Sequence, residues 1–216
     1  MHASRSLFLS LDGLDGTGKT TQLLKLQAWL TSNGIAATTC ADPGGTEIGA
    51  QLREILLHGR STQMSLRAES LMFMASRAEL VERIIRPALS RGDVVLADRF
   101  LLANVVYQGH AGGLDPDDLW SIGLFSTGQL EPDRVLVLDL SIEEARQRRS
   151  RERDRIESRD DWYFQRVRDG FLFEARRRPE YHTVIDATGS PDEVQAQIRA
   201  VVSPLLVARG HSLTTV

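Results

Sequence analysis

The sequence predicts an α/β fold, a doubly wound five-stranded parallel sheet with helices on both faces. Two observations support this class. Short, continuous apolar runs recur along the chain, and such runs are typical of strands that are buried on both faces of a parallel sheet. Longer segments with helical periodicity separate these runs, which is the alternation expected of a doubly wound domain.

Apolar runs mark the predicted strands, which are residues 7–12 (LFLSLD), 34–40 (GIAATTC), 94–98 (VVLAD), 134–140 (RVLVLDL) and 182–186 (HTVID). The predicted helices cover residues 18–32, 48–58, 65–90, 100–110, 116–130, 141–180 and 191–207. The chain shows no internal repeat, low-complexity linker or domain boundary, so its 216 residues (1–216) are expected to form a single domain.

The predicted helix at 65–90 carries a clear apolar stripe. Its members share a 4-3-4 spacing that is typical of core packing, and they are Met74, Ala78, Val81 and Ile85. Phe73 lies beside this stripe, and Arg77 follows it one turn later. An aromatic ring and an arginine on one flank are compatible with a pocket wall, whereas Phe73 taken alone is expected to belong to the core.

Composition and charge exclude several classes of protein. The net charge of −3 gives no general reason to expect a nucleic-acid partner, and no apolar run approaches the ~18 residues of a membrane span. Cys40 is the single cysteine, which excludes an internal disulfide or a cysteine metal cluster and fits a reducing cytoplasm. The first apolar run leads directly into a glycine-rich turn, so we expect a strand there rather than a signal peptide.

Positive charge is concentrated in residues 146–178, which contain 12 arginines and 7 acidic residues. The rest of the chain has 14 basic and 22 acidic residues, so a basic segment lies on an acidic body. This distribution is compatible with a local anionic partner. It is also compatible with a solvated helix face on which arginines and glutamates pair.

A phosphate-binding motif follows the first predicted strand and opens the first predicted helix. The motif G-x-x-x-x-G-K-[ST] is matched by Gly13, Leu14, Asp15, Gly16, Thr17, Gly18, Lys19 and Thr20. Its glycines let backbone N–H groups face one anion, and the helix N-terminus adds its positive end. Lys19 is expected to reach the β- and γ-phosphates and Thr20 to meet Mg²⁺. The motif therefore predicts a P-loop NTPase domain that binds a nucleoside triphosphate with Mg²⁺.

Two further segments indicate whether the phosphate is also transferred. Asp98 ends the apolar run VVLAD, a Walker B pattern in which the carboxylate orients Mg²⁺ directly or through water. Arg99 follows at the carboxyl end of the strand, where open α/β sheets bind ligands. The turn at 43–45 precedes a helix that carries Arg53, which is either an exposed arginine or a ligand of an anion. The N-K-x-D motif of GTPases is absent from the sequence.

These segments together resemble the thymidylate kinase family, in its bacterial form with an arginine-rich lid. The resemblance covers nearly the whole chain and rests on five motifs in the same order, which are GLDGTGKTT, DPGGT followed by LREILL, LMFMASRAELV, DRFLLANVVYQG and RRSRERDRIE. Five ordered motifs are far more specific than the phosphate loop alone.

The resemblance implies an enzyme of dTTP biosynthesis that transfers the γ-phosphoryl group of ATP to dTMP, giving dTDP, with Mg²⁺ as cofactor. It implies a cytoplasmic homodimer and a small helical lid at about residues 146–158. The catalytic residues it implies are Lys19, Arg99, Arg148, Arg149, Arg151 and Arg153. Thr20 and Asp98 are the expected metal ligands, and the phosphate loop is the expected ATP site.

The resemblance also assigns residues to the acceptor. Phe73 is expected to stack on thymine and Arg77 to contact the base edge. The acceptor phosphate is expected to bind Arg53 and Arg99. Along the nucleoside the family places Asn104, Tyr107 and Gln108, with Tyr107 near the 2′ position of the sugar, and it places Asp15 near the 3′-hydroxyl or the metal.

The chain departs from the family pattern at several positions. Where the family usually has Arg-Glu before Pro-Gly-Gly-Thr, this chain has Ala41 and Asp42, and Ala103 replaces a frequent serine. Ser150 interrupts the usual spacing of the lid arginines. Three alternatives stay open: a kinase for another monophosphate or a deoxynucleoside, a nucleotide-dependent switch that binds without phosphorylating, and an inactive kinase.

Overall fold

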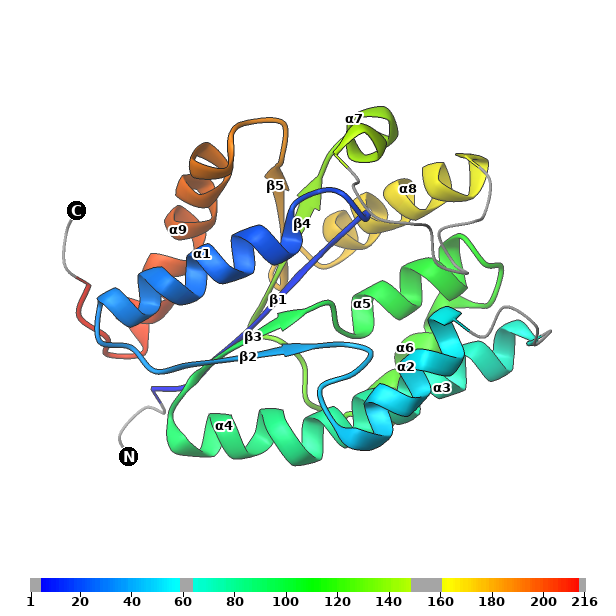
Figure 1. Cartoon of the computed structure of the whole chain (residues 1–216), viewed down its shortest axis with the longest axis horizontal. Helices are drawn as coiled ribbons and strands as arrows, with labels where there is room; N and C mark the ends of the chain where they lie inside the picture. Colours follow the sequence, from blue (N-terminus) through cyan, green and yellow to red (C-terminus); the bar gives the residue numbers. More distant parts are fainter. Residues whose placement is uncertain (1–4, 59–63, 149–160, 214–216) are drawn as a thin grey trace.

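A five-stranded parallel sheet in the order β2-β3-β1-β4-β5 forms the centre of the molecule (Figure 1). The computed structural model describes residues 5–58, 64–148 and 161–213. The strands are β1 (Leu7–Gly13), β2 (Ala37–Ala41), β3 (Val94–Asp98), β4 (Arg134–Asp139) and β5 (His182–Asp186). Neighbouring strands all run parallel, so the predicted sheet is confirmed.

Burial along the strands follows their place in the sheet. Every residue of the central strand β1 is buried, whereas the edge strands β2 and β5 are partly exposed. The prediction for β2 is wrong at its start, because the strand begins at Ala37 rather than at residue 34. Gly34 has a φ of 68° and belongs to the turn that follows α1.

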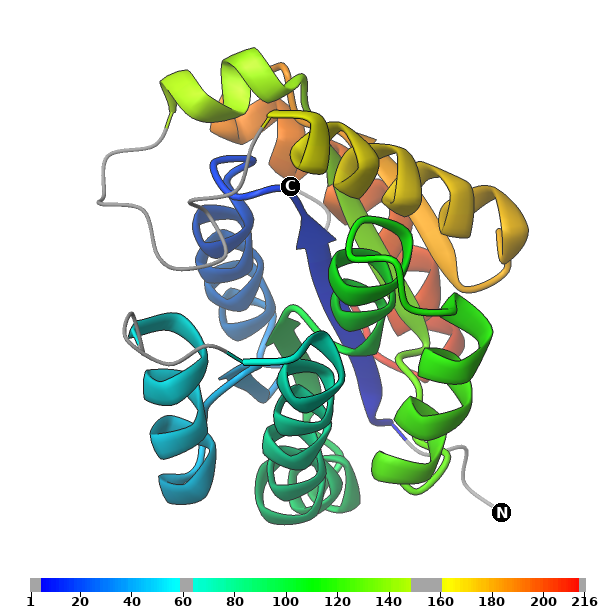
Figure 2. The same ribbon diagram turned by 90° about the vertical axis from the view of Figure 1, so that its right-hand side faces the viewer.

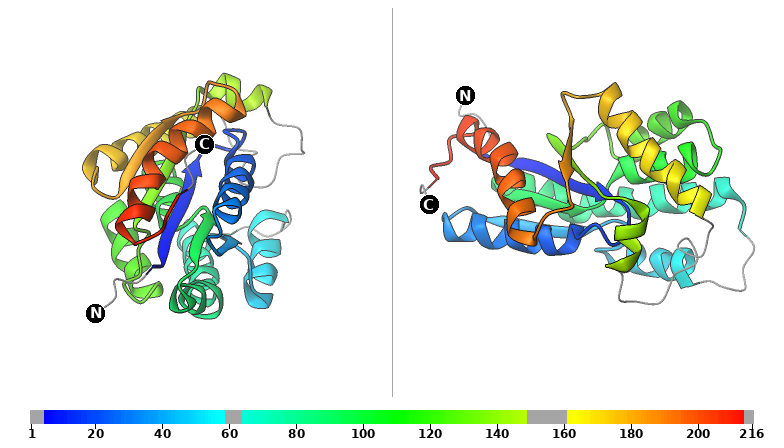
Figure 3. Two further views of the ribbon diagram at one scale, coloured as in Figure 1. Left: turned by 90° about the vertical axis from the view of Figure 1, so that its left-hand side faces the viewer. Right: turned by 90° about the horizontal axis from the view of Figure 1, so that it is seen from above.

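Helices cover both faces of the sheet, as predicted. They are α1 (Lys19–Ser32), α2 (Glu47–His58), α3 (Leu66–Leu80), η1 (Val81–Ile85), α4 (Arg86–Arg91), α5 (Leu101–Asn104), η2 (Val105–His110), α6 (Pro116–Ser126), α7 (Ile142–Gln147), α8 (Asp161–Arg177) and α9 (Pro191–Ala208). Helices α1 and α9 pack together on one face, and α4, α5 and α8 pack on the other (Figures 2 and 3). None of the helices in the described ranges is long and apolar enough to cross a bilayer.

The long helix predicted at 65–90 is present as α3, η1 and α4, with a π-helical turn in its middle. Three members of the predicted stripe, Met74, Val81 and Ile85, are buried in the core, and Ala78 is half-buried. The prediction at 100–110 is likewise present as α5 and η2. Since π-helical turns are frequent at functional sites, η2 is a natural place for ligand-facing side chains.

Two helix predictions are wrong in extent. The helix predicted at 116–130 ends at Ser126, because Gly128 and Gln129 adopt φ angles of 58° and 63°. The segment predicted as one helix at 141–180 contains two helices, α7 and α8. α7 ends at Gln147, with Arg148 as its C-cap, and α8 ends at Arg177 rather than at residue 180. Residues 149–160, and with them most of the predicted lid, lie outside the described residues.

The strand order determines where a ligand can bind. β1 pairs with β3 on one side and with β4 on the other, so the chain reverses its direction of winding at β1. Crevices at the carboxyl ends of strands next to such a reversal are the usual ligand sites of open α/β sheets. The loops after β1 and β3 lie at this edge.

Candidate active site

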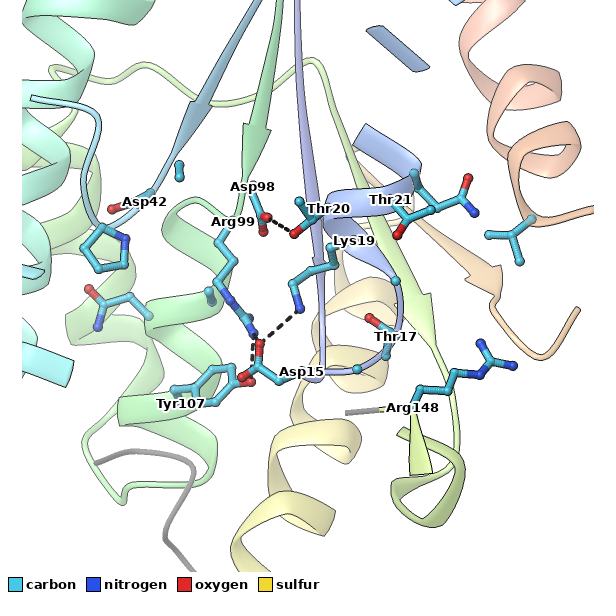
Figure 4. Close-up of a pocket in the computed structure, with 18 of the residues that line it drawn as sticks. Asp15, Thr17, Lys19, Thr20, Thr21, Asp42, Asp98, Arg99, Tyr107 and Arg148 are labelled. Atoms are coloured by element: carbon cyan, nitrogen blue, oxygen red, sulfur yellow. Dashed lines mark hydrogen bonds and ion pairs between the residues drawn. The ribbon is translucent and has the colours of Figure 1, made fainter. Parts of the chain in front are cut away.

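A cavity of about 860 Å³ opens at the carboxyl ends of β1 and β3 (Figure 4). Its walls come from the loop after β1, the turn after β2, helix α3, the α5–η2 segment and the loop before α9. These segments are far apart in sequence and meet only because the sheet brings their strands together. The cavity has the size of a small-molecule site.

The loop between β1 and α1 has the backbone geometry of an anion site. Gly13 and Gly16 have φ angles of 132° and 91°. A Cβ atom at either position would collide with a backbone carbonyl oxygen, that of Leu138 or that of Ala145. Gly18 is the N-cap of α1, and no side chain caps the first amides of that helix. These amides are therefore available to a phosphate.

Lys19 lies folded into this loop. Its Nζ donates to the carbonyl oxygen of Leu14 at 2.8 Å and lies 3.4 Å from Asp15 Oδ1. Burial, and then repulsion by Arg99, lowers the pKa of Lys19. The ammonium of Lys19 is thus paired mainly with backbone carbonyl oxygens, and a polyanion bound in the loop would give this buried cation a stronger partner.

Thr20 and Asp98 form a pair of oxygen donors beside the loop. The Thr20 hydroxyl donates to Asp98 Oδ2 at 2.9 Å (Figure 4). Within the described ranges, no group of three or more His, Cys, Asp or Glu residues could hold a metal. One hydroxyl and one carboxylate suit a hard cation that takes its other ligands from phosphate and water, as Mg²⁺ does. The donors present therefore fit the predicted Mg²⁺.

Arg99 projects into the cavity from the end of β3. Its Nη2 donates to Asp15 Oδ1 at 2.8 Å, and its guanidinium lies over the ring of Tyr107, 5.0 Å from the centroid. Burial is the largest single influence and opposes the charge of Arg99, but the combined attraction of Asp15, Tyr107, Asp98 and Asp12 outweighs it and raises the pKa of the guanidinium. Its buried Nη1 has no hydrogen-bond partner among the described residues. A cation with a spare donor at this place fits an anionic ligand.

Asp15 joins the two halves of the site. Its Oδ1 accepts from Arg99 and pairs with Lys19, so the phosphate loop and the arginine after β3 meet at one carboxylate (Figure 4). Tyr107 also belongs to this group of residues, because its hydroxyl oxygen accepts a hydrogen bond from Arg99 Nη2 at 3.2 Å. Burial raises the pKa of Tyr107, which keeps the phenol neutral.

The wall opposite the phosphate loop combines an aromatic ring with a polar cluster. Phe73 is 8% exposed and belongs both to the core and to the cavity wall, so each interpretation of this residue holds in part. Arg77 is buried, and its Nε donates to Asp42 Oδ2. Arg53 Nη1 donates to the carbonyl oxygen of Pro43 at 2.7 Å. The cavity is also lined by Asn104 and Gln108.

A comparison with known proteins identifies the family. A sequence profile described as thymidylate kinase matches residues 11–198. The chain belongs to the thymidylate kinase family. It is 45% identical over 205 residues to the thymidylate kinase of Symbiobacterium thermophilum, with 94% of this chain and 96% of the relative covered. It is 42% identical over 200 residues to that of Rhodopirellula baltica, with 93% and 81% covered.

A solved structure supports the fold assignment. The crystal structure of thymidylate kinase from Ehrlichia chaffeensis matches with a TM-score of 0.73 and 28% identity, and the match covers 91% of this chain and 98% of that one. The family resemblance drawn from the five sequence motifs is therefore confirmed, as is the P-loop NTPase fold. The family and the fold together place the chain among the nucleoside monophosphate kinases.

The arginines expected in the family's lid are only partly described. Arg148 lines the cavity and donates to the carbonyl oxygens of Ala187 and Thr188 at 2.8 and 3.0 Å. Its guanidinium points away from Lys19 (Figure 4). The other three expected catalytic arginines lie outside the described residues, and they are Arg149, Arg151 and Arg153.

Sequence reasoning missed several residues at or under the site. Asp12 is fully buried below the loop, accepts from Ser10 Oγ at 3.0 Å and leaves Oδ1 without a partner within the described part of the chain. Burial raises the pKa of Asp12 to about 6. The loop at 188–191 also lines the cavity. Two sequence signals could have revealed these residues. Asp12 is a carboxylate inside an apolar strand, and Ser190 begins the capping box that opens α9.

Proposed function

We propose that the protein transfers the γ-phosphoryl group of ATP to dTMP, giving dTDP for dTTP biosynthesis, as a single nucleoside monophosphate kinase domain. One observation carries this proposal. Lys19 in the triphosphate-binding loop and Arg99 at the acceptor side meet at Asp15 within one cavity. A donor and an acceptor bound at these two cations would have their phosphates side by side, which is what direct transfer needs.

The donor side is the phosphate loop. Its free amides and Lys19 would bind the β- and γ-phosphates of ATP, and Thr20 with Asp98 would hold Mg²⁺. When bound, the metal neutralises charge on the transferring phosphoryl group. Lys19 then exchanges its carbonyl partners for phosphate oxygens. These groups align the two substrates and neutralise the charge of the phosphates. The nucleophile is the acceptor phosphate oxygen itself, so no general base of unusual pKa is required.

The acceptor side selects a pyrimidine monophosphate. Arg99, whose buried Nη1 has no partner among the described residues, and Arg53 would bind the phosphate of dTMP. Phe73 offers a stacking face, and Tyr107 would lie along the sugar. Arg77 can only donate hydrogen bonds, so it suits the carbonyl edge of thymine and not the amino edge of cytosine. This polarity supports dTMP over dCMP.

An acceptor panel tests the proposed function. We expect ADP release to depend on an added monophosphate and dTMP to give the highest kcat/KM among dTMP, dCMP, AMP and GMP. Preference for a purine monophosphate or a nucleoside contradicts the proposal. ATP hydrolysis without acceptor dependence would instead indicate a nucleotide-dependent switch. A coupled spectrophotometric assay of ADP separates these outcomes.

At least one lid arginine is proposed to neutralise the transferring phosphoryl group. Single alanine substitutions of the four candidates are expected to reveal a loss of ~10²-fold or more in kcat with little change in Tm or in the KM for ATP. The candidates are Arg148, Arg149, Arg151 and Arg153. An exposed ion pair makes no contribution to the rate of the chemical step. Wild-type kcat in all four variants would therefore mean that these arginines only form a solvated surface and have no catalytic role.

A cytoplasmic homodimer completes the proposal. Leu71 on α3 and Phe125 on α6 are 54% and 83% exposed, and Ile122 on α6 is 41% exposed. The two helices touch, since Ser126 Oγ lies 3.7 Å from Met74 Sδ. Large apolar side chains exposed on adjacent helices support a self-association surface. The single cysteine of the chain is in keeping with a reducing compartment.

A further inference from the structure

A buried carboxylate, Glu69, lies at one end of a hydrogen-bonded chain that leads to the acceptor wall. Glu69 is 1% exposed and sits in the first turn of α3, where the helix dipole favours a negative charge. Gln108 Nε2 donates to Glu69 Oε1 at 2.9 Å. Glu69 itself does not line the cavity, whereas Gln108 does.

The chain continues from Gln108 through Asn104. Asn104 Nδ2 donates to Gln108 Oε1 at 2.8 Å and to Ser70 Oγ at 3.2 Å. Asn104 Oδ1 in turn accepts from Arg77 Nη1 at 3.2 Å. Every side chain in this hydrogen-bonded series is buried, so each hydrogen bond forms where leaving a polar atom unpaired would be costly.

The direction of these bonds follows from the carboxylate. A carboxylate only accepts, so Glu69 requires the NH₂ group of Gln108 to face it. Gln108 must then present its oxygen to Asn104, which in turn must present its own oxygen to Arg77. Amides have two orientations of nearly equal shape, and only the partners at the ends of the chain select one.

A second carboxylate lies at the other end. Asp42 Oδ2 accepts from Arg77 Nε, so the guanidinium is held between Asp42 and Asn104 Oδ1. If the amide of Asn104 were reversed, its NH₂ group would face a guanidinium that has no acceptor to offer. The orientation of the arginine that faces the acceptor base thus depends on a carboxylate three side chains away.

We propose that Glu69 is a positioning residue for the acceptor. Without touching the substrate, it sets the amide orientation of Gln108 and Asn104 and thereby the guanidinium of Arg77. The inference rests on the proposed function, because it takes dTMP as the ligand that Arg77 reads. It concerns the acceptor only, since none of the hydrogen-bonded residues from Glu69 to Arg77 belongs to the phosphate loop.

The test uses Glu69→Gln, which keeps the shape of the side chain and lets the amide chain reverse. We expect the KM for dTMP and its calorimetric dissociation constant to rise about tenfold, with kcat and the KM for ATP within about twofold of wild type. Glu79→Gln is the matched control, because Glu79 lies on the same helix, is 33% exposed and pairs with Arg83 outside the cavity. It should leave all these values unchanged.

An exchange variant separates positioning from simple structural support. In Glu69→Gln combined with Gln108→Glu, the new amide donates to the new carboxylate, whose other oxygen again accepts from Asn104 Nδ2. The original direction of the Asn104 amide is restored, so most of the lost dTMP affinity should return.

Three results would overturn the inference. The first is wild-type dTMP affinity in Glu69→Gln. The second is an equal rise of the KM values for dTMP and ATP with no recovery in the exchange variant, and the third is failure of both variants to fold. Failure of the proposed function is recognised separately, because the wild-type enzyme would then neither bind nor phosphorylate dTMP.

Discussion

Replacement of Lys19 by alanine is expected to lower kcat for phosphoryl transfer by ~10³-fold or more, which abolishes activity in ordinary assays. Lys19 is the cation of the phosphate loop, and its ammonium lies among the carbonyl groups that surround the anion site. The fold should persist, because the side chain faces the ligand and its charge is already disfavoured by burial and by Arg99. Steady-state kinetics with dTMP and a thermal melt measure both effects.

The chain offers a matched control for this substitution. Lys25 is the other lysine of the sequence and lies on the same helix as Lys19. Its Nζ pairs with Asp192 Oδ1 at 2.7 Å. Lys25→Ala removes the same charge outside the cavity and should leave kcat within about twofold of wild type, since an exposed ion pair contributes little. Unchanged turnover in Lys19→Ala would contradict the assignment of the phosphate loop.

Replacement of Arg99 by alanine is expected to lower kcat/KM for dTMP by about 10²- to 10³-fold while the KM for ATP changes little. Arg99 carries a buried donor that has no partner among the described residues, and its loss also leaves Asp15 with fewer cationic partners. Arg99→Lys should recover only part of the activity, because an ammonium keeps the charge and loses the planar fork. Initial rates at varied dTMP and varied ATP distinguish the two KM values.

The backbone at this position provides a further variant. Arg99 has a φ of 68°, a conformation that glycine adopts without strain. Arg99→Gly should therefore be at least as stable as Arg99→Ala and equally inactive, which separates chemistry from stability. Arg83→Ala is the control, since Arg83 is 74% exposed and pairs with Glu79. A raised KM for ATP with normal use of dTMP would instead place Arg99 on the donor side.

The sequence was sufficient wherever the relevant physics is local. The eight residues from Gly13 to Thr20 specify an anion site by themselves, because positive-φ glycines and a helix N-terminus suffice to build one. The central strands β1, β3 and β4 were predictable because burial on both faces demands a continuous apolar run. The start of β2 and the end of α7 at Gln147 were not, since a turn alters the boundary of an element without altering the periodicity nearby.

Only the tertiary structure decided which polar groups meet. Asp15 and Arg99 are 84 residues apart, and they pair because β1 and β3 are neighbours in the sheet. The same strand order brings Asp98 to Thr20. Glu69 was invisible in the sequence as a site residue, because a glutamate in the first turn of a helix is ordinarily a solvated end. Hydrogen-bond partners depend on sheet order, helix rotation and side-chain direction, and local periodicity constrains none of these across distant segments.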